Sequence, residues 1–80
     1  TQQVLSLLKI FTRQHTREEL QEQLGLLDRE NFRKIYLNPA IEQGWVALTI
    51  PDKPTSSKQK YYLTEKGKEF LLNMKKNIIH

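Results

Sequence analysis

The stretch from Thr16 to Tyr36, TREELQEQLGLLDRENFRKIY, has the pattern of two short helices joined by a tight turn. Thr16 with Glu19 three residues later matches a capping box, in which a hydroxyl and a carboxylate satisfy free N–H groups at a helix start. Leu20 and Leu24 lie four residues apart and indicate the buried face of the first helix. The stretch therefore predicts a helix-turn-helix motif.

The second helix of the pair is predicted over residues 29–43, after a turn that begins at Gly25. This glycine is expected at the left-handed C-cap of the first helix, and Leu26 and Leu27 are expected to anchor the turn. Pro39 predicts a kink or a restart, because proline lacks an N–H group and disfavours the helical conformation of the residue before it. The buried face is predicted from apolar residues with the helical period, at Phe32, Ile35, Tyr36, Ala40 and Ile41.

The flanking segments complete a winged helix-turn-helix of the α+β class. A helix is predicted at residues 1–11, strands at 45–50 and 60–64 around a polar loop at 51–59, and a last helix at 65–77. The connector 12–15 is short enough to be a loop or the stub of an edge strand. Residues 1–80 thus predict one domain, with a three-helix core, a two- or three-stranded β wing and a C-terminal helix.

Two aromatic positions and one glycine are interpreted structurally. Trp45 follows the helix-ending glycine and is expected in the core rather than in base stacking. Tyr62 lies on the opposite strand face from Tyr61 and is the aromatic residue most expected to be exposed. Gly67 is expected to allow another element to approach the last helix closely.

Length and composition exclude several classes of protein. The 80 residues contain no cysteine, so a disulfide framework and a thiol nucleophile are excluded, and a cytoplasmic location is expected. No apolar run approaches the ~20 residues of a membrane span, and no signal peptide is present. His15 and His80 lack metal-ligand spacing, and no cofactor is expected. Because the chain begins at Thr1 rather than at a methionine, we expect a module from a larger protein.

The positive charge is concentrated in the second half of the chain. Thirteen Lys and Arg against nine Asp and Glu give a net charge of +4. Residues 1–44 hold six basic and six acidic side chains, whereas residues 45–80 hold seven basic and three acidic ones. This distribution is compatible with a solvated surface and with nucleic-acid binding.

Three segments together resemble a known family. Residues 28–44, DRENFRKIYLNPAIEQG, with TIPDKP at 49–54 and QKYYLT at 59–64, resemble the C-terminal winged-helix domain of bacterial Fic-family proteins. They also resemble the group described as transcriptional regulators or RecG-related ATP-dependent DNA helicases. The resemblance covers about residues 16–70 and implies a terminal DNA-binding or interaction module of a multidomain cytosolic protein.

No catalytic motif is found in the chain itself. It lacks the glycine-rich phosphate loop of a helicase motor and the His-Pro-Phe motif of Fic adenylylation. Any ATPase or adenylyltransferase chemistry is therefore expected in other parts of the parent protein.

The leading functional prediction is binding of double-stranded DNA. The predicted contacts are Arg29, Asn31, Arg33 and Lys34 on the second helix of the motif, and Lys53, Lys58 and Lys60 on the wing. A recognition helix lies in the major groove, where Arg pairs with guanine and Asn with adenine, while lysines suit phosphate oxygens. The alternative interpretation of these residues is a solvated helix face and a solvated loop, and Glu30 would repel phosphate.

A second prediction is a protein-interaction or homodimerisation module that does not bind DNA. Winged helices also serve this purpose, because a fold does not determine a function. The predicted surface would use Leu7, Ile10, Ile78 and Ile79 on the first and last helices. Other domains of the parent protein are the remaining predicted partners.

Overall fold

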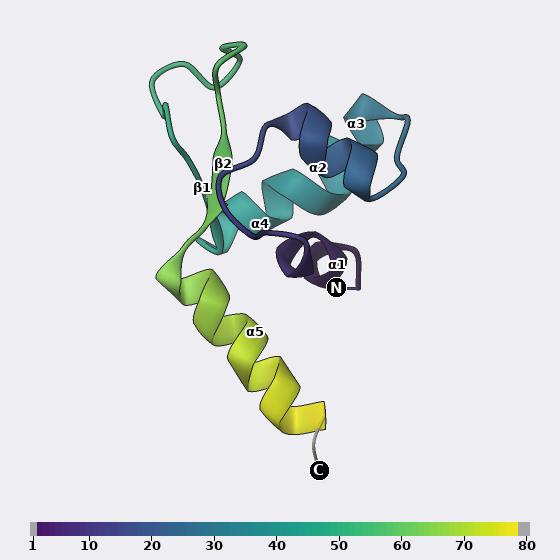
Figure 1. Cartoon of the computed structure of the whole chain (residues 1–80), viewed down its shortest axis with the longest axis vertical. Helices are drawn as coiled ribbons and strands as arrows, with labels where there is room; N and C mark the ends of the chain where they lie inside the picture. The colour runs from purple at the N-terminus through teal and green to yellow at the C-terminus, as the bar shows by residue number, and fades with distance from the viewer. Residues whose placement is uncertain (1, 79–80) are drawn as a thin grey trace.

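The computed structural model describes the backbone of residues 2–78 and the side chains of residues 2–74. Its elements are α1 (Gln2–Lys9), α2 (Arg17–Gln23), α3 (Arg29–Asn31), the π-helical segment η1 (Phe32–Leu37), α4 (Asn38–Glu42), β1 (Val46–Leu48), β2 (Tyr61–Leu63) and α5 (Glu65–Ile78). Figure 1 shows the helical part beside the β1–β2 hairpin, with α5 extending away from both. The predicted α+β winged helix-turn-helix is confirmed.

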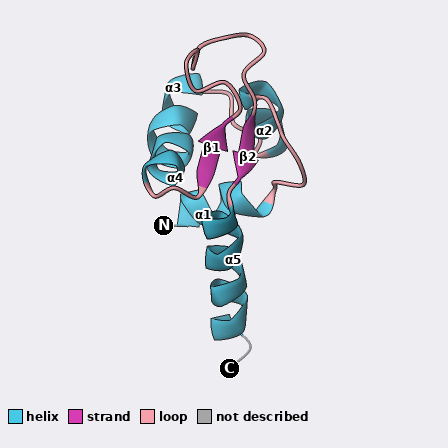
Figure 2. Ribbon diagram, turned by 90° about the vertical axis from the view of Figure 1, so that its left-hand side faces the viewer, coloured by secondary structure: helices cyan, strands magenta, loops and turns pink. Residues whose placement is uncertain are grey.

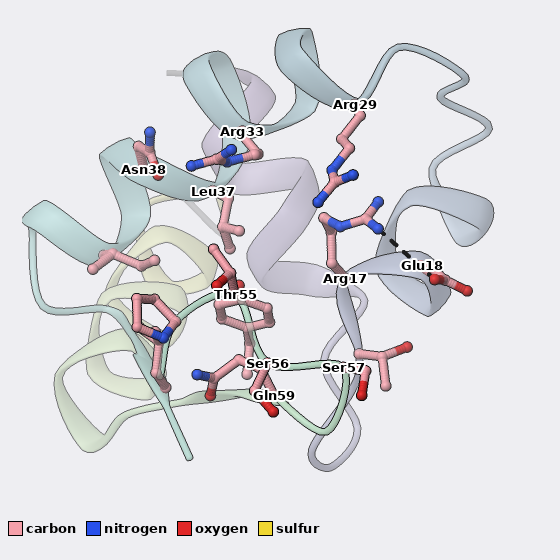
Figure 3. A pocket seen from close by; sticks show the side chains of 15 residues that line it. Arg17, Glu18, Arg29, Arg33, Leu37, Asn38, Thr55, Ser56, Ser57 and Gln59 are labelled. Carbon is pink, nitrogen blue, oxygen red and sulfur yellow. Dashed lines mark ion pairs between the residues drawn. The ribbon is translucent and has the colours of Figure 1, made fainter. Parts of the chain in front are cut away.

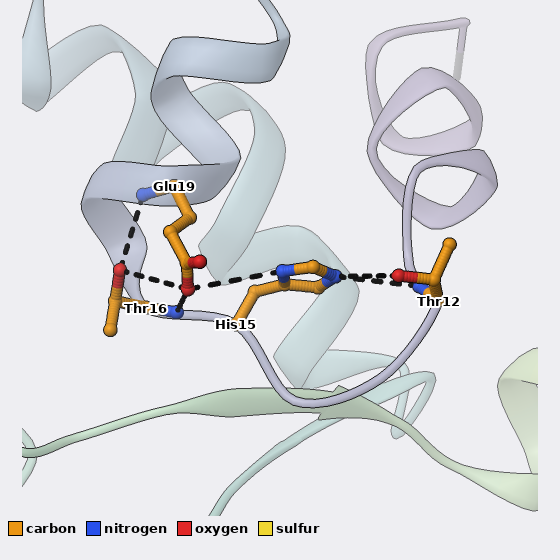
Figure 4. Close-up of polar contacts among 4 residues, drawn as sticks. All are labelled: Thr12, His15, Thr16 and Glu19. Atoms are coloured by element: carbon orange, nitrogen blue, oxygen red, sulfur yellow. Dashed lines mark hydrogen bonds and ion pairs between the residues drawn. The ribbon is translucent and has the colours of Figure 1, made fainter.

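The start of α2 is held by the predicted capping box. The N–H of Glu19 donates to the Thr16 hydroxyl over 3.2 Å, and the N–H of Thr16 donates to the Glu19 carboxylate over 2.9 Å (Figure 4). The bond from the Thr16 N–H lowers the pKa of the Glu19 carboxyl below its ordinary value. Because this pKa is lower in the folded chain, the associated stability is present at neutral pH and is lost on acidification through that pKa.

Thr16→Ala should lower the free energy of unfolding by about 1 kcal/mol at neutral pH, because it removes the acceptor of the Glu19 N–H. It should also slightly weaken the loss of stability in acid, because the Thr16 hydroxyl donates to the Glu19 carboxylate over 3.3 Å and adds to the lowering of the Glu19 pKa. The Thr16 N–H, which lowers this pKa most, is kept in the variant. Urea denaturation at neutral and acidic pH measures both effects. Glu22→Gln, an exposed change in the same helix, is the control. Equal acid sensitivity of Thr16→Ala and the unsubstituted chain would contradict this account.

The turn after α2 is predicted correctly at two residues and wrongly at a third. Gly25 has φ 70°, and its N–H donates to the Glu22 carbonyl over 3.0 Å. Leu26 packs against the core, in agreement with the prediction. Leu27 is 99% exposed and anchors nothing. Side chains of successive residues in non-helical, extended backbone point to opposite sides, so only one of the two leucines can face the core.

Residues 29–42 form one helical run whose geometry changes twice. In the π-helical segment η1, Phe32 and Leu37 are both buried, whereas Ile35, predicted in the core, is 41% exposed. A π-turn closes over one more residue than an α-turn, so apolar positions five apart share a face. The run returns to α geometry at Asn38, directly before Pro39, so the change of geometry lies at the predicted place, but the helix is not interrupted and Asn38 keeps helical dihedral angles. Proline lacks the N–H that an uninterrupted α-helix would need there.

The sheet is antiparallel and has two strands, with Val46 opposite Leu63 and Leu48 opposite Tyr61. Both strands are shorter than predicted. The connector before α2 supplies one bridge, in which His15 and Tyr61 exchange backbone hydrogen bonds of 2.9 and 2.7 Å. The stub of edge strand is therefore a single residue. Figure 2 shows the long wing loop beyond one end of this hairpin and α5 beyond the other.

The base of α5 packs closely on the chain segment that enters β1. The ring of Trp45 stacks on Phe70 with centroids 4.0 Å apart, so Trp45 is half-buried at the edge of the core, close to its predicted place. Gly67 allows the predicted close approach, because a Cβ atom there would lie 2.7 Å from Leu63 Cδ1 and 3.1 Å from the Trp45 carbonyl carbon. The Thr64 hydroxyl accepts the Gly67 N–H over 3.0 Å and caps the helix.

The packing of α1 covers part of the surface that was predicted for protein interaction. Leu7 is fully buried, because α1 turns this residue into the core. Ile10 is partly buried against the same core. The side chain of Ile78 and the whole of Ile79 lie outside the described residues. In the part of the chain that the structure describes, no helix combines the length and apolarity that a bilayer crossing requires.

Candidate nucleic-acid interface

A cleft of about 400 Å³ lies between the helical run 29–42, the start of α2 and the wing loop (Figure 3). Four residues of the run, spaced four apart, line one side of it: Arg29, Arg33, Leu37 and Ile41. The facing wall comes from residues 54–57 of the wing. The cleft is charged at the N-terminal end of the helical run and apolar at its C-terminal end.

The two arginines of the helical run have no carboxylate partner. Arg29 and Arg33 are exposed, and neither side chain forms an ion pair within the described residues. Their helix starts at Asp28, whose carboxylate accepts the N–H of Asn31 over 3.2 Å and caps the first turn. The guanidinium groups are therefore available to an external anion.

Arg17 is a third arginine of the cleft, and it was not among the predicted site residues. Its Nη1 donates to the Gln21 side chain over 2.6 Å, and its Nη2 lies 3.8 Å from the Glu18 carboxylate. Its place in the first turn of α2 is compatible with many surface roles. The one feature of the sequence that could have indicated a site role for Arg17 is its position at the start of the helix before the recognition helix.

Gln59 holds the wing in place and was also not predicted. This glutamine is 4% exposed, although it lies in a polar loop. Its side-chain N–H groups donate to the carbonyls of Ile50 over 2.5 Å and Lys53 over 2.9 Å. Its side-chain oxygen accepts the N–H of Ile50 over 2.9 Å and the Thr49 hydroxyl over 3.4 Å. These bonds present the hydroxyl side chains of the cleft wall, Thr55, Ser56 and Ser57.

The seven predicted DNA-binding residues do not all line the cleft. Arg29 and Arg33 line the cleft, whereas Asn31 and Lys34, on the same helical run, do not. On the wing, Lys53 and Lys58 are exposed but lie outside the residues that line the cleft. Lys60 belongs to a different groove.

That second groove, of about 580 Å³, lies between the connector before α2, the strand β2 and the start of α5. It holds Lys60 and Tyr62, the latter 38% exposed as predicted. Arg13 and Lys68 also line it, and Lys68 is paired with Glu65 over 3.3 Å. Strand alternation explains the separation, because Gln59 and Tyr61 point toward the first cleft while their neighbours point away.

His15, which the sequence did not predict to bind a metal, has the surroundings of a structural residue. His15 is buried, and its Nε2 lies 3.2 Å from the Thr12 hydroxyl. Its Nδ1 lies 3.9 Å from the Glu19 carboxylate and has no hydrogen bond to any described residue (Figure 4). Within residues 2–78, no group of three or more histidine, cysteine or acidic side chains is arranged to hold a metal ion.

Comparisons with known proteins agree on one family. Residues 2–64 match the family model described as "Filamentation induced by cAMP protein Fic-like, C-terminal domain". A crystal structure of a Fic family protein from Desulfovibrio desulfuricans G20 is 41% identical, with a TM-score of 0.77. The match covers 81% of this chain but only 20% of that chain. A search of curated proteins gives no match.

Proposed function

Because this chain belongs to the family of Fic-like C-terminal domains, we propose that it is the double-stranded DNA-binding module of a larger Fic family protein. The observation that carries the proposal is the helix start at residues 29–34, where Arg29, Arg33 and Lys34 are exposed. It presents two arginines that no carboxylate of the described chain neutralises. The chain spans a fifth of the length of the solved relative. Any statement about the activity of the whole protein is therefore a proposal too.

The recognition helix would enter the major groove through its N-terminal residues, as second helices of this motif do. Arg29 and Arg33 carry the charge that this approach requires, and Lys34 adds to it on a neighbouring helix face. Asn31 offers an amide group that can pair with adenine. Within the described residues, Arg29 and Arg33 form no ion pair that has to break before they meet DNA, which removes one cost of binding.

The wing would contact the flanking backbone. Lys53 and Lys58 are exposed on it, and lysine contacts to phosphate position a protein without reading sequence. Lys60 faces the second groove. We therefore assign Lys60 a contribution through its charge rather than through a phosphate contact beside the recognition helix.

The proposal gives this domain no catalytic step and places it in the cytoplasm. Adenylyltransferase or ATPase chemistry would belong to other parts of the parent protein. Neither the matching family model nor the solved relative is described as a helicase, so the helicase-related part of the resemblance stays a prediction.

Titration of a random-sequence DNA duplex at two salt concentrations tests the proposal. We expect salt-sensitive binding, and a roughly tenfold or greater loss of affinity at low salt for the double variant Arg33→Ala with Lys34→Ala. The double variant Lys9→Ala with Lys66→Ala removes the same charge from exposed positions outside the cleft and should bind nearly normally. Absence of binding at low salt, together with concentration-dependent dimers, would favour the protein-interaction alternative.

A further inference from the structure

We propose that the cleft between the recognition helix and the wing is a phosphate-binding site, formed by Arg17, Arg29 and Arg33 together with wing hydroxyls. The ligand is one phosphate group, supplied either by the DNA backbone or by a free nucleotide. If the DNA backbone supplies the phosphate, this inference rests on the proposed function. If a free nucleotide supplies it, the inference is independent of that function.

The charge of the cleft is the first argument. Three arginines line it against one acidic residue, Glu18, which lies beside Arg17. Figure 3 shows the guanidinium groups of Arg17 and Arg29, from two different helices, pointing toward the same space. Like charges that converge repel one another, and Arg29 and Arg33 are also spaced four apart on one helix, which disfavours the helix by itself. A bound anion relieves both repulsions.

The chemistry of the lining selects phosphate among anions. A guanidinium group donates two parallel hydrogen bonds that match the geometry of phosphate oxygens. The opposite wall offers the hydroxyls of Thr55, Ser56 and Ser57, which add donors of variable direction. A tetrahedral phosphate has three or more oxygens with which it can accept from both walls at the same time, whereas a carboxylate has two.

The apolar end of the cleft bounds the site on the side away from the arginines. Leu37, Ile41 and Leu48 line it, and Gln59 keeps the wing wall at its place. These apolar side chains leave the polar donors of the cleft at its cationic end, where Arg29 and Arg33 are exposed to solvent. The volume of about 400 Å³ lies in the range of small-ligand sites and admits a phosphate with its attached sugar.

The cleft divides the predicted DNA contacts into those that would bind phosphate and those that would reach base edges. Arg29 and Arg33 would position the domain on a phosphate, and such a contact carries no sequence information. Asn31 and Lys34 lie outside the cleft lining and stay available for base edges.

The test is an NMR titration of the isotopically labelled chain with inorganic pyrophosphate and with adenosine monophosphate. We expect backbone amide shifts that saturate and that concentrate at residues 17, 29–33 and 55–57. The double variant Arg29→Gln with Arg33→Gln should bind both probes about tenfold or more weakly. The matched control, Lys9→Gln with Lys66→Gln, removes the same charge from exposed positions outside the cleft and should bind them as the unsubstituted chain does.

A duplex-DNA arm distinguishes the two sources and separates this inference from the proposed function. If DNA binds and pyrophosphate competes with it at the cleft amides, the backbone is the source. If DNA does not bind but pyrophosphate still shifts these amides, the DNA proposal fails and the cleft serves a free phosphate ester. If pyrophosphate gives no shifts, or shifts that the lysine control abolishes equally, the phosphate site is overturned, whatever DNA does.

Discussion

Gly67→Ala should lower the free energy of unfolding by about 2–3 kcal/mol, although alanine is the better helix former. The added Cβ atom would meet the carbonyl oxygen of Trp45 and lie 2.7 Å from Leu63 Cδ1. A backbone carbonyl cannot turn aside as a flexible side chain can. The base of α5 would have to move away from the chain before β1, and the stacked rings of Trp45 and Phe70 would separate.

Thermal or urea denaturation measures this change, because each kcal/mol shifts the Tm of a domain of this size by about 4–8 °C. Glu69→Ala, an exposed position two residues along the same helix, is the matched control and should stay within about 0.5 kcal/mol of the unsubstituted chain. A Gly67→Ala chain as stable as the control would show that α5 does not pack against the segment before β1 in the described way.

Gln59→Leu should cost about 2 kcal/mol and should loosen the wing rather than the helices. Leucine has a similar size but cannot replace the four hydrogen bonds of the amide. The N–H of Ile50 would lose its partner, and the carbonyls of Ile50 and Lys53 would each lose one of two donors. The loop would then open toward water to satisfy these groups, and the hydroxyl wall of the cleft would open with it.

Hydrogen exchange of the wing amides, measured beside that of the α2 amides, tests this prediction. The wing amides should exchange faster in Gln59→Leu, while the α2 amides keep their protection relative to global unfolding. Gln43→Leu places the same side chain at an exposed glutamine outside the wing and controls for added surface apolarity. Unchanged protection of residues 50–59 in Gln59→Leu would show that this amide does not hold the wing.

Local signals in the sequence predicted much of the fold. Thr16 with Glu19, Gly25 and the alternation around Tyr61 each depend on a few neighbouring residues, so the chain encodes them without reference to distant contacts. The two leucines after Gly25 marked the turn, but they did not show which of them faces inward.

Features that depend on distant contacts could not be predicted in the same way. Ile35 was assigned to the core because a period of 3.6 was assumed, whereas the π-helical segment turns Leu37 inward instead. Arg17 and Gln59 were missed as site residues because their places in the cleft depend on distant segments that only the folded chain brings together. Of the predicted contacts, Arg29 and Arg33 line one cleft, whereas Lys60, directly before β2, lines another groove.

The wide helical turn at residues 32–37 also governs the direction of the cleft. On a uniform α-helix, positions four apart advance by about 40° more than a full turn, so Arg29 and Ile41 would differ by about 120° in azimuth. One additional residue in the π-turn takes up roughly 100° of this angular drift. The row from Arg29 to Ile41 therefore runs nearly parallel to the helix axis. This single π-turn thus gives a straight cleft that is cationic at one end and apolar at the other.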